Sequence, residues 1–345
     1  MKIVISGGGT GGHFYPAMAV LEAFERQGHQ VSYVGAKRGI EAEKVAAFTP
    51  HFQLLELSGL LGHRLRYKLH SLWQLSRAVS HLRRHFRSHR PDAVLGFGGY
   101  ASAAAIVAAR LCGIPTFLHE QNARAGLTNT VLDRFTTASF SAYGNLGENM
   151  GLPLRATAFH PLPSQQRSNL LIMGGSQGSL FLNTFVLDYL PHLTALNIDI
   201  YHQAGAPLYD EFKEQLHRRY GHELPEHYHC FAFRDDIHEI MAHSSIALSR
   251  SGAGAVFELM SLQVPTVFIP FPAAAHDHQY HNALFFEQRG CAMVHRQEEF
   301  LQNPMQIINR LRSHKEEYHE HLRQLSLRTS PDELAHRVLQ LLPGR

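Results

Sequence analysis

The 345-residue chain has little of what marks secreted, membrane-spanning or strongly charged proteins. Its three cysteines, Cys112, Cys230 and Cys291, stand far apart and form no C-x-x-C pair. This spacing argues against a disulfide framework or a zinc ribbon and fits a reducing cytoplasm. No run of about 20 mainly apolar residues is present to span a membrane. The N-terminal MKIVISGGG predicts a strand and a turn rather than a cleavable signal.

Several chemical signatures are also missing. The chain has no nucleotide-triphosphatase loop G-x-x-x-x-G-K-S/T and no D-x-D pair to hold a divalent metal against a diphosphate. We therefore predict neither a cofactor nor a resident metal. The formal net charge is only +3 and no nucleic-acid-binding motif occurs, so the basic run LRRHFRSHR does not predict a nucleic-acid partner.

What the chain does have is a regular alternation of short apolar runs with helical patterns, which is typical of parallel βαβ units. The expected strands lie within residues 2–6, 30–35, 92–99, 114–122, 168–183, 197–205, 227–233, 244–252 and 264–271. We predict an α/β protein of two Rossmann-like, doubly wound parallel-sheet domains, 1–156 and 157–330, with a linker near 150–163. Ligands of such sheets bind beyond the carboxyl ends of the strands, which predicts a cleft where the domains face each other.

Three glycine-rich loops follow expected strands, at residues 7–12, 96–99 and 174–178. Such loops let backbone N–H groups approach an anion at the start of the next helix. The first loop, GGGTGGHFYP, matches the dinucleotide fingerprint G-x-G-x-x-G, but a nicotinamide site also needs an acid at the end of the second strand. That strand ends in VSYVGAKRG, with no acid before Glu41. The three loops together favour a different diphosphate site, although any one of them is also explained as a tight turn.

Six motifs occur in order over residues 7–284: GGGTGGHFYPA, GFGGYASA, HEQNARAGLTN, MGGSQGSLFLN, SRSGAGAVFEL and AHDHQYHNAL. In combination they closely resemble the MurG family of UDP-N-acetylglucosamine:lipid I N-acetylglucosaminyltransferases. The resemblance implies the two-domain glycosyltransferase B fold, whose last helix, here about 331–345, packs back on the N-terminal domain. It also implies inverting transfer of N-acetylglucosamine to the muramoyl 4-hydroxyl of lipid I, giving lipid II for peptidoglycan synthesis.

The resemblance further implies that the donor UDP-N-acetylglucosamine binds mainly to the C-terminal domain. Glu258 would accept hydrogen bonds from the two ribose hydroxyls, since a carboxylate accepts two bonds at once; a helix acid favoured by the dipole is the alternative. The implied donor-binding residues are Thr10, Gly11, Gly12, Asn122, Arg155, Ser176, Arg234, Ala253, Gly254, Ala255, Val256, Phe257, Glu258, Gln279 and Asn282. Three positions depart from the family pattern, where Asn is common at Leu152, Thr at Ala255 and an apolar residue at Arg234.

An inverting transfer needs a base beside the acceptor hydroxyl and stabilisation of the departing UDP. The resemblance places His13 closest to the base role, and a histidine suits proton uptake near neutral pH. The alternative is a histidine that only packs behind the glycine loop. Glu120 is the second candidate base, and a carboxylate that positions its own loop is the stronger interpretation of it.

Two histidine groups could suggest a metal. His81, His85 and His89 stand among arginines that would repel a cation, which favours a solvated basic face. A second group, His276, His278 and His281, overlaps the motif that the family uses for the sugar, which favours ligand positioning over metal binding.

Residues 57–91 contain no Asp or Glu but carry basic residues, an apolar stripe at helical spacing and the only tryptophan. This pattern is typical of a helix on an anionic membrane surface, whereas the alternative is a stripe that packs on the domain core. The predicted membrane contacts are Leu72, Trp73, Leu75, Val79, Leu82, Phe86, Arg83 and Arg84.

We therefore expect a peripheral enzyme on the cytoplasmic face of the bacterial inner membrane. Its expected partners are UDP-N-acetylglucosamine, lipid I, anionic lipid and other cell-wall synthesis or division proteins. Three alternatives stay open: a relative that glycosylates another lipid such as diacylglycerol, a UDP-N-acetylglucosamine epimerase, and a nicotinamide oxidoreductase.

Overall fold

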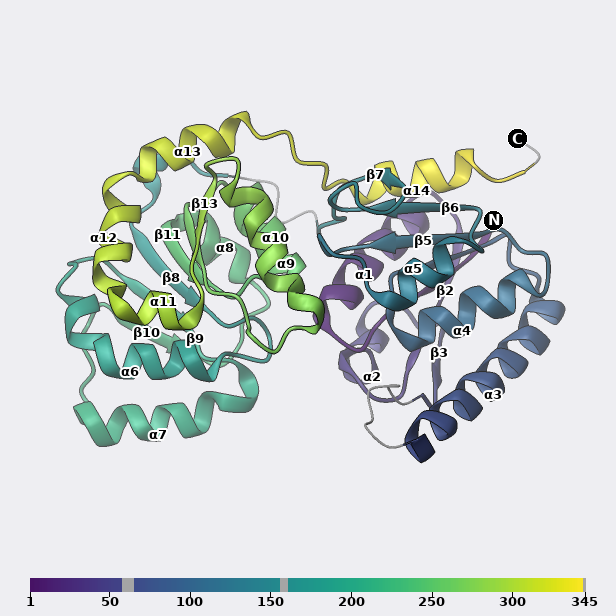
Figure 1. Ribbon diagram of the computed structural model, residues 1–345, viewed down its shortest axis with the longest axis horizontal. Helices are drawn as coiled ribbons and strands as arrows, with labels where there is room; N and C mark the ends of the chain where they lie inside the picture. Colours follow the sequence, from purple (N-terminus) through teal and green to yellow (C-terminus); the bar gives the residue numbers. More distant parts are fainter. Residues whose placement is uncertain (58–64, 156–160, 344–345) are drawn as a thin grey trace. The chain divides into compact units, whose positions relative to one another are not determined.

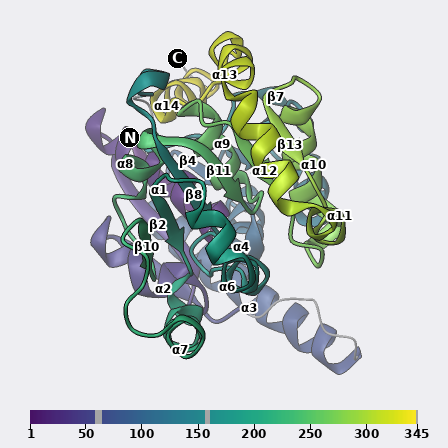
Figure 2. The same cartoon turned by 90° about the vertical axis from the view of Figure 1, so that its left-hand side faces the viewer.

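The computed structural model describes the chain apart from residues 58–64, 156–160 and 344–345, and for 65–68 it describes the backbone alone. The chain forms two compact units (Figure 1). Unit 1 comprises residues 1–155 and 328–345, and unit 2 comprises residues 156–327. Each unit is a parallel sheet with helices on its faces (Figures 1 and 2), which confirms the predicted fold class.

Unit 1 holds the glycine loop at residues 7–12. Its elements in chain order are β1 (Lys2–Ser6), α1 (Gly11–Arg26), β2 (Gln30–Ala36), α2 (Ile40–Lys44), η1 (Val45–Ala47), β3 (Phe52–Leu55), α3 (Leu65–His89), β4 (Ala93–Gly96), α4 (Gly99–Arg110), β5 (Thr116–Glu120), α5 (Leu127–Asp133), β6 (Ala138–Ser141), β7 (Glu148–Asn149) and α14 (Pro331–Gln340). The strand order is β3-β2-β1-β4-β5-β6-β7. Ile3 in the central β1 pairs with Val31 of β2 and Ala93 of β4. Both faces of this strand are covered, which is why its middle residues, Ile3, Val4 and Ile5, are all apolar.

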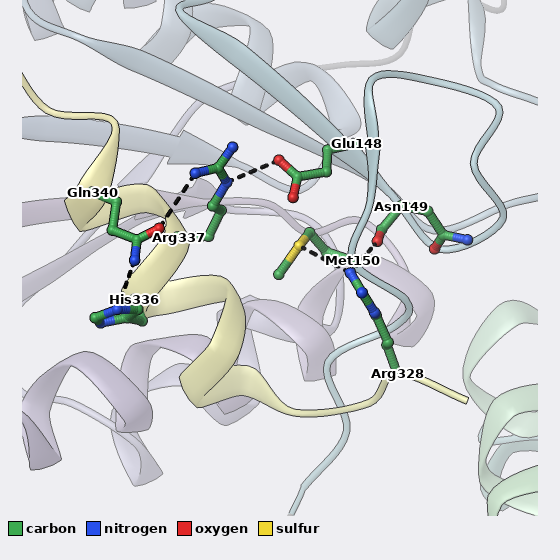
Figure 3. A network of polar contacts seen from close by, with 7 residues as sticks. All are labelled: Glu148, Asn149, Met150, Arg328, His336, Arg337 and Gln340. Carbon is green, nitrogen blue, oxygen red and sulfur yellow. Dashed lines mark hydrogen bonds and ion pairs between the residues drawn. The ribbon is translucent and has the colours of Figure 1, made fainter. Parts of the chain in front are cut away.

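The last helix, α14, completes the core of unit 1. Leu334 and Val338 are fully buried in the same cluster as the apolar face of α1. Polar contacts at its edge hold the helix in register: Nε of Arg337 donates to Glu148 at 2.9 Å, and Arg328 donates to the backbone of β7 (Figure 3). A segment from the end of the chain is thus part of the first unit.

Unit 2 repeats the plan with a six-stranded sheet. Its elements are η3 (Ser164–Gln166), β8 (Asn169–Met173), α6 (Leu180–Thr194), β9 (Ile200–Gln203), η4 (Ala206–Leu208), α7 (Tyr209–Tyr220), β10 (Tyr228–Phe231), α8 (Ile237–His243), β11 (Ser244–Ser249), α9 (Ala253–Ser261), β12 (Thr266–Phe268), η5 (Ala275–Asp277), α10 (His278–Glu287), β13 (Ala292–Val294), α11 (Gln297–Gln302), α12 (Pro304–Ser313) and α13 (Lys315–Gln324). The strand order is β10-β9-β8-β11-β12-β13. Leu171 of β8 pairs with Tyr201 and Ala247 on either side. The carboxyl ends of β8 and β11 therefore lead into neighbouring loops, 174–179 and 250–252.

Helix α3 corrects part of the predicted membrane surface. Leu82 and Phe86 are buried against α4 in the core of unit 1, and Leu75 and Val79 pack at its margin. The prediction that Leu82 and Phe86 contact a membrane is wrong, because the regular apolar stripe is the buried face of the helix. Among the described residues, none of the helices has the length and apolar character needed to cross a bilayer.

Candidate active site

The first glycine loop positions His13 at the start of α1. Gly8 and Gly9 have φ angles of +133° and +87°, which glycine adopts without steric cost. The loop turns so that Nδ1 of His13 lies 3.1 Å from the carbonyl oxygen of Gly8. Because a carbonyl only accepts, Nδ1 carries the hydrogen in this contact and Nε2 is the nitrogen with the lone pair. This is the tautomer that a base acting through Nε2 requires.

Glu41, which follows β2 in α2, holds the same loop. Its carboxylate is fully buried and accepts from the Gly9 amide at 3.0 and 2.8 Å and from the Ala36 amide at 3.1 Å. The acid that a nicotinamide site needs near the end of the second strand is thus present but faces the protein's own loop.

Glu120 lies at the end of β5 and is 1% exposed. Its carboxylate accepts four hydrogen bonds, from the backbone and side chain of Asn122 (2.9 and 3.1 Å), the Gly126 amide (3.0 Å) and the Asn129 side chain (2.7 Å). A carboxylate has about four acceptor positions, so all of them are in use. The geometry therefore favours the loop-positioning role over that of a base.

The other unit 1 candidates lie around this centre. Thr10 caps α1 without a side-chain bond, so its hydroxyl does not occupy the first-turn amides of Gly11 and Gly12. Gly98 passes so close to His13 that a Cβ there would lie 3.2 Å from Nε2. The guanidinium of Arg155 lies over the ring of Tyr15, 5.2 Å from its centre.

In unit 2, the loop between β11 and α9 is a candidate anion site. Gly252 caps α9 without a side-chain bond, which leaves the amides of Ala253, Gly254 and Ala255 without intrahelical partners. The Val256 amide, by contrast, donates to the Gly252 carbonyl at 3.0 Å. The Val256 amide is therefore already used by the helix, and a donor-binding role of Val256 cannot rest on it.

Arg250, just before this loop, is buried beneath it. Its guanidinium donates to Ser179 Oγ (2.9 Å), to the carbonyls of Ile269 and Pro270 (both 2.9 Å) and to Gln297 Oε1 (2.7 Å). All these acceptors are neutral, and burial lowers the pKa of Arg250 to about 10, which leaves the side chain cationic at neutral pH. Ser179 also caps α6, accepting from the Leu182 amide at 3.3 Å. A buried positive charge thus lies between the starts of α6 and α9.

Gln279 and Asn282 of α10 hold the same loop from its other side. Gln279 Oε1 accepts from the amides of Ser251 (3.3 Å) and Phe271 (3.0 Å), which directs its amide hydrogens elsewhere. Asn282 is fully buried and donates to the Ser251 carbonyl at 3.2 Å. Gln279 therefore has donor capacity for a ligand, while Asn282 shapes the loop.

Glu258 projects from the middle of α9 with its side chain 21% exposed. Its Oε1 lies 3.4 Å from Nε2 of the buried His238, without the alignment of a hydrogen bond. Phe257, its neighbour, is buried against Phe286 and has no surface to offer a ligand. Of these two predicted residues, only Glu258 is placed to bind one.

Ser176 and Arg234 stand in other loops of unit 2. Ser176 lies in the partly exposed glycine loop that follows β8. The Arg234 guanidinium forms a bidentate ion pair with Asp236 and lines a pocket with Tyr209, Lys213 and His229. The side chain of Arg234, which the resemblance implies as a donor-binding residue, is thus engaged locally by Asp236.

No cluster of three His, Cys, Asp or Glu side chains suited to a metal exists within the described parts of the chain. The rings of His85 and His89 stack with centres 4.0 Å apart. Nδ1 of His278 donates to the nearby Ala275 carbonyl at 2.8 Å.

Sequence reasoning missed three residues that organise the site. Glu41 was noticed but given no role, and Arg250 was overlooked, because their roles depend on burial and on partners far along the chain. Asn183 was overlooked too: it is buried, donates to the Ala204 carbonyl at 3.1 Å and pairs with His202. Their presence inside the motifs SRSGAG and GGSQGSLFLN was the available signal for Arg250 and Asn183.

Comparisons with known proteins identify both units. Residues 3–141 match the Glycosyltransferase family 28 N-terminal domain, and residues 169–336 match the Glycosyltransferase family 28 C-terminal domain. Two curated relatives are each named UDP-N-acetylglucosamine--N-acetylmuramyl-(pentapeptide) pyrophosphoryl-undecaprenol N-acetylglucosamine transferase. The Glaesserella parasuis protein is 33% identical over 309 residues, covering 87% of this chain and 86% of its own. The Acidithiobacillus ferrooxidans protein is 37% identical over 310 residues, covering 86% and 84%.

Solved structures agree. The crystal structure of Acinetobacter baumannii MurG superposes with a TM-score of 0.78 at 25% identity, covering 98% of this chain and 99% of that one. A putative UDP-N-acetylglucosamine 2-epimerase from Listeria monocytogenes has a TM-score of 0.66 at 14% identity over 98% and 94%, which is a likeness of fold alone. Since both family domains match and relatives exceed 30% identity over most of their length, the chain belongs to the MurG family of glycosyltransferases.

Proposed function

We propose that this protein transfers N-acetylglucosamine from UDP-N-acetylglucosamine to the muramoyl 4-hydroxyl of lipid I, forming lipid II. The observation that carries the proposal is the loop of unit 1, which fixes His13 in the tautomer of a base. Unit 2 would supply the donor site: the first-turn amides of α9 would meet the diphosphate, with the charge of the buried Arg250 beneath them, and Glu258 would accept from the ribose hydroxyls. No step requires a metal ion for its proton or electron balance.

In the chemical step, the acceptor oxygen attacks C1 of the sugar from the face opposite UDP. Its proton passes to Nε2 of His13, so the histidine becomes a cation. The bond between C1 and the phosphate oxygen breaks and UDP leaves with the electron pair. The α-linkage of the donor becomes a β-linkage, and the charge that grows on UDP is met by helix amides and arginine.

The lipid acceptor requires contact with a membrane, and α3 with α5 supplies a suitable surface. Near the start of α3, Leu69, Leu72 and Trp73 are 58%, 51% and 54% exposed, in the part of the helix that extends beyond its neighbours in unit 1 (Figure 2). Arg77 lies over the Trp73 ring, 4.7 Å from its centre. On α5 and the turn after it, further apolar side chains are exposed, namely Leu127, Val131 and Phe135. We propose that this surface holds the protein on the cytoplasmic face of the bacterial inner membrane.

Vesicle co-sedimentation tests the membrane surface. Replacing Leu72 and Trp73 by serine should reduce binding to vesicles of phosphatidylglycerol, because apolar burial and basic charge act together at such an interface. Leu301→Ser, which changes an exposed leucine of unit 2, is the matched control. Equal binding of both variants, or binding that ignores salt and anionic lipid, contradicts this assignment.

Transfer of labelled sugar tests the function. With UDP-N-acetylglucosamine as donor, label should enter lipid I, and UDP-glucose should serve poorly. Label in diacylglycerol in place of lipid I would establish the related lipid glycosyltransferase. Release of UDP with epimerised or free sugar in the absence of lipid would establish the epimerase reaction.

A further inference from the structure

Glu41 and His13 bond the two ends of one peptide group. The Glu41 carboxylate accepts from the Gly9 N–H, at 3.0 Å to Oε1 and 2.8 Å to Oε2. The carbonyl of that same peptide belongs to Gly8, and its oxygen lies 3.1 Å from Nδ1 of His13. A chain of hydrogen bonds therefore runs from the Glu41 carboxylate, through the N–H and C=O of this one peptide group, to the Nδ1–H of the His13 ring.

We propose that Glu41 is a positioning residue that acts on His13 through the Gly8–Gly9 peptide. This inference rests on the proposed function, in which His13 is the base. A carboxylate on the N–H side polarises the peptide and strengthens its carbonyl as an acceptor. The stronger acceptor holds the hydrogen on Nδ1, keeps the lone pair on Nε2 and stabilises the imidazolium formed in the reaction. One peptide group thus takes the place of direct contact between acid and histidine.

Three surrounding glycines leave the space that the Glu41 side chain occupies. A Cβ on Gly8 would lie 2.2 Å from Glu41 Oε1, and one on Gly39 would lie 2.7 Å from Oε2. A Cβ on Gly35 would lie 2.9 Å from the Glu41 Cγ. Glycine therefore stands at three positions around the Glu41 side chain, and two of these glycines, Gly8 and Gly39, have φ above +120°.

The acid is also buried without a cation. No lysine, arginine or histidine within the described ranges forms an ion pair with Glu41, and its carboxylate accepts instead from the backbone amides of Gly9 and Ala36. The nearby Tyr33 hydroxyl, which donates to the Gly7 carbonyl, has its pKa raised by burial first and by Glu41 second. A neutral side chain would fill this space at a lower desolvation cost, so an anion here calls for a role that depends on charge.

The immediate surroundings of His13 do not offer another acid in the same position. Gly98 faces Nε2, and behind it stands Asn129, which donates to Glu120. Glu120 has all four of its acceptor positions filled by its own loop. Within the described part of unit 1, Glu41 is the carboxylate that reaches the Nδ1 side.

The test uses the full-length chain with Glu41→Gln, which keeps the shape and removes the charge. Glu43→Gln, which changes an exposed acid two residues further along α2, is the matched control. Nitrogen-15 spectra of the unliganded proteins report the tautomer of His13. We expect Nδ1–H alone in wild type and in Glu43→Gln, and a mixture of tautomers in Glu41→Gln. Steady-state kinetics should show kcat reduced by about 10- to 100-fold, with the donor KM and UDP affinity within about twofold of wild type.

A Glu41→Asp variant should recover part of kcat, since it restores the anion. The inference is overturned if Glu41→Gln retains both the wild-type tautomer and the wild-type kcat, or if donor KM rises while kcat stays constant. If Glu41→Gln does not fold, the wild-type protein provides the test. The proposal requires that the Gly9 amide is protected from hydrogen exchange and that His13 carries its hydrogen on Nδ1, and it is overturned if either is not observed. Because the spectra need no acceptor, they separate failure of this inference from failure of the lipid I assignment.

Discussion

At the scale of single residues, the proposed ribose role of Glu258 predicts selectivity for a ribonucleotide. Glu258→Ala should weaken UDP binding by about 1–3 kcal/mol, because two hydroxyl donors lose their acceptor. Calorimetry with UDP and with 2′,3′-dideoxy-UDP measures this directly. Wild type should prefer UDP, and the variant should bind the two nucleotides alike. Unchanged UDP affinity in the variant would reject the ribose role.

Two buried histidines set the acid limit of the fold. Burial lowers the pKa of His119 to about 4 and that of His202 to about 3, whereas the same residues in the unfolded chain titrate near 6.5. As pH falls from 6.5 to 4, the unfolded chain therefore gains protons that the folded chain does not, and stability decreases. For His119 the loss is about 3 kcal/mol at most.

Urea unfolding at several pH values measures this effect. His202→Asn should flatten the decline for unit 2, since it removes the titrating group, while the exposed His243→Gln should leave the decline as in wild type. A wild-type unfolding free energy that is constant between pH 6.5 and 4 would contradict the neutral, buried state of both histidines.

Functional residues that belong to a sequence motif can be predicted from the sequence. Residues whose role depends on being buried beside distant parts of the chain cannot. His13 and Glu258 stand in motifs and were predicted. Glu120 was named the second candidate base, with loop positioning as the stronger interpretation, but its four donors come from residues up to nine positions away, which only folding brings together. Glu41 was noticed and set aside, because no sequence pattern shows that a carboxylate faces its own chain.

At the scale of elements, Arg250 connects the starts of α6 and α9 and places a buried charge under the candidate diphosphate site. Arg250→Gln should therefore lower the ratio of UDP affinity to uridine affinity by at least about tenfold, which corresponds to about 1.4 kcal/mol. Arg167→Gln is the matched control: Arg167 is buried in the same unit, bonds the carbonyls of Leu162 and Gln263, and has its pKa lowered by burial to about 10. A gain that survives in Arg250→Gln, or that falls equally in Arg167→Gln, would contradict the role of Arg250.

Helix α3 shows the limit of pattern reading for an element. Its 3–4 spacing predicts an amphipathic helix, but spacing alone does not say whether protein or lipid covers the apolar face. In unit 1 the end of the regular stripe, at Leu82 and Phe86, packs on α4, whereas Leu72 at the start of the stripe is exposed and the exposed Trp73 lies off it. The alternative of a buried stripe was the correct interpretation for its C-terminal half.

At the scale of the whole molecule, two units of similar plan were predictable because each repeats a strand, a glycine loop and a helix. Length, alternation and the absence of long apolar runs were enough for the α/β class. The short strands β3, β7 and β13 carry too few residues for a clear period, and their pairing depends on the sheet beside them. The return of α14 to unit 1 came only from the family resemblance, since its partner α1 lies over 300 residues away.

The central claim joins family, fold and site: this chain moves N-acetylglucosamine to lipid I with His13 as the base. The most direct measurement is the rate of labelled transfer from UDP-N-acetylglucosamine to lipid I by wild type and His13→Ala, with UDP affinity measured on both. The proposed mechanism predicts labelled lipid II from wild type, kcat lower by about 100-fold or more in the variant, and equal UDP affinity. Near-normal turnover by purified His13→Ala, or no labelled lipid from wild type, would contradict it.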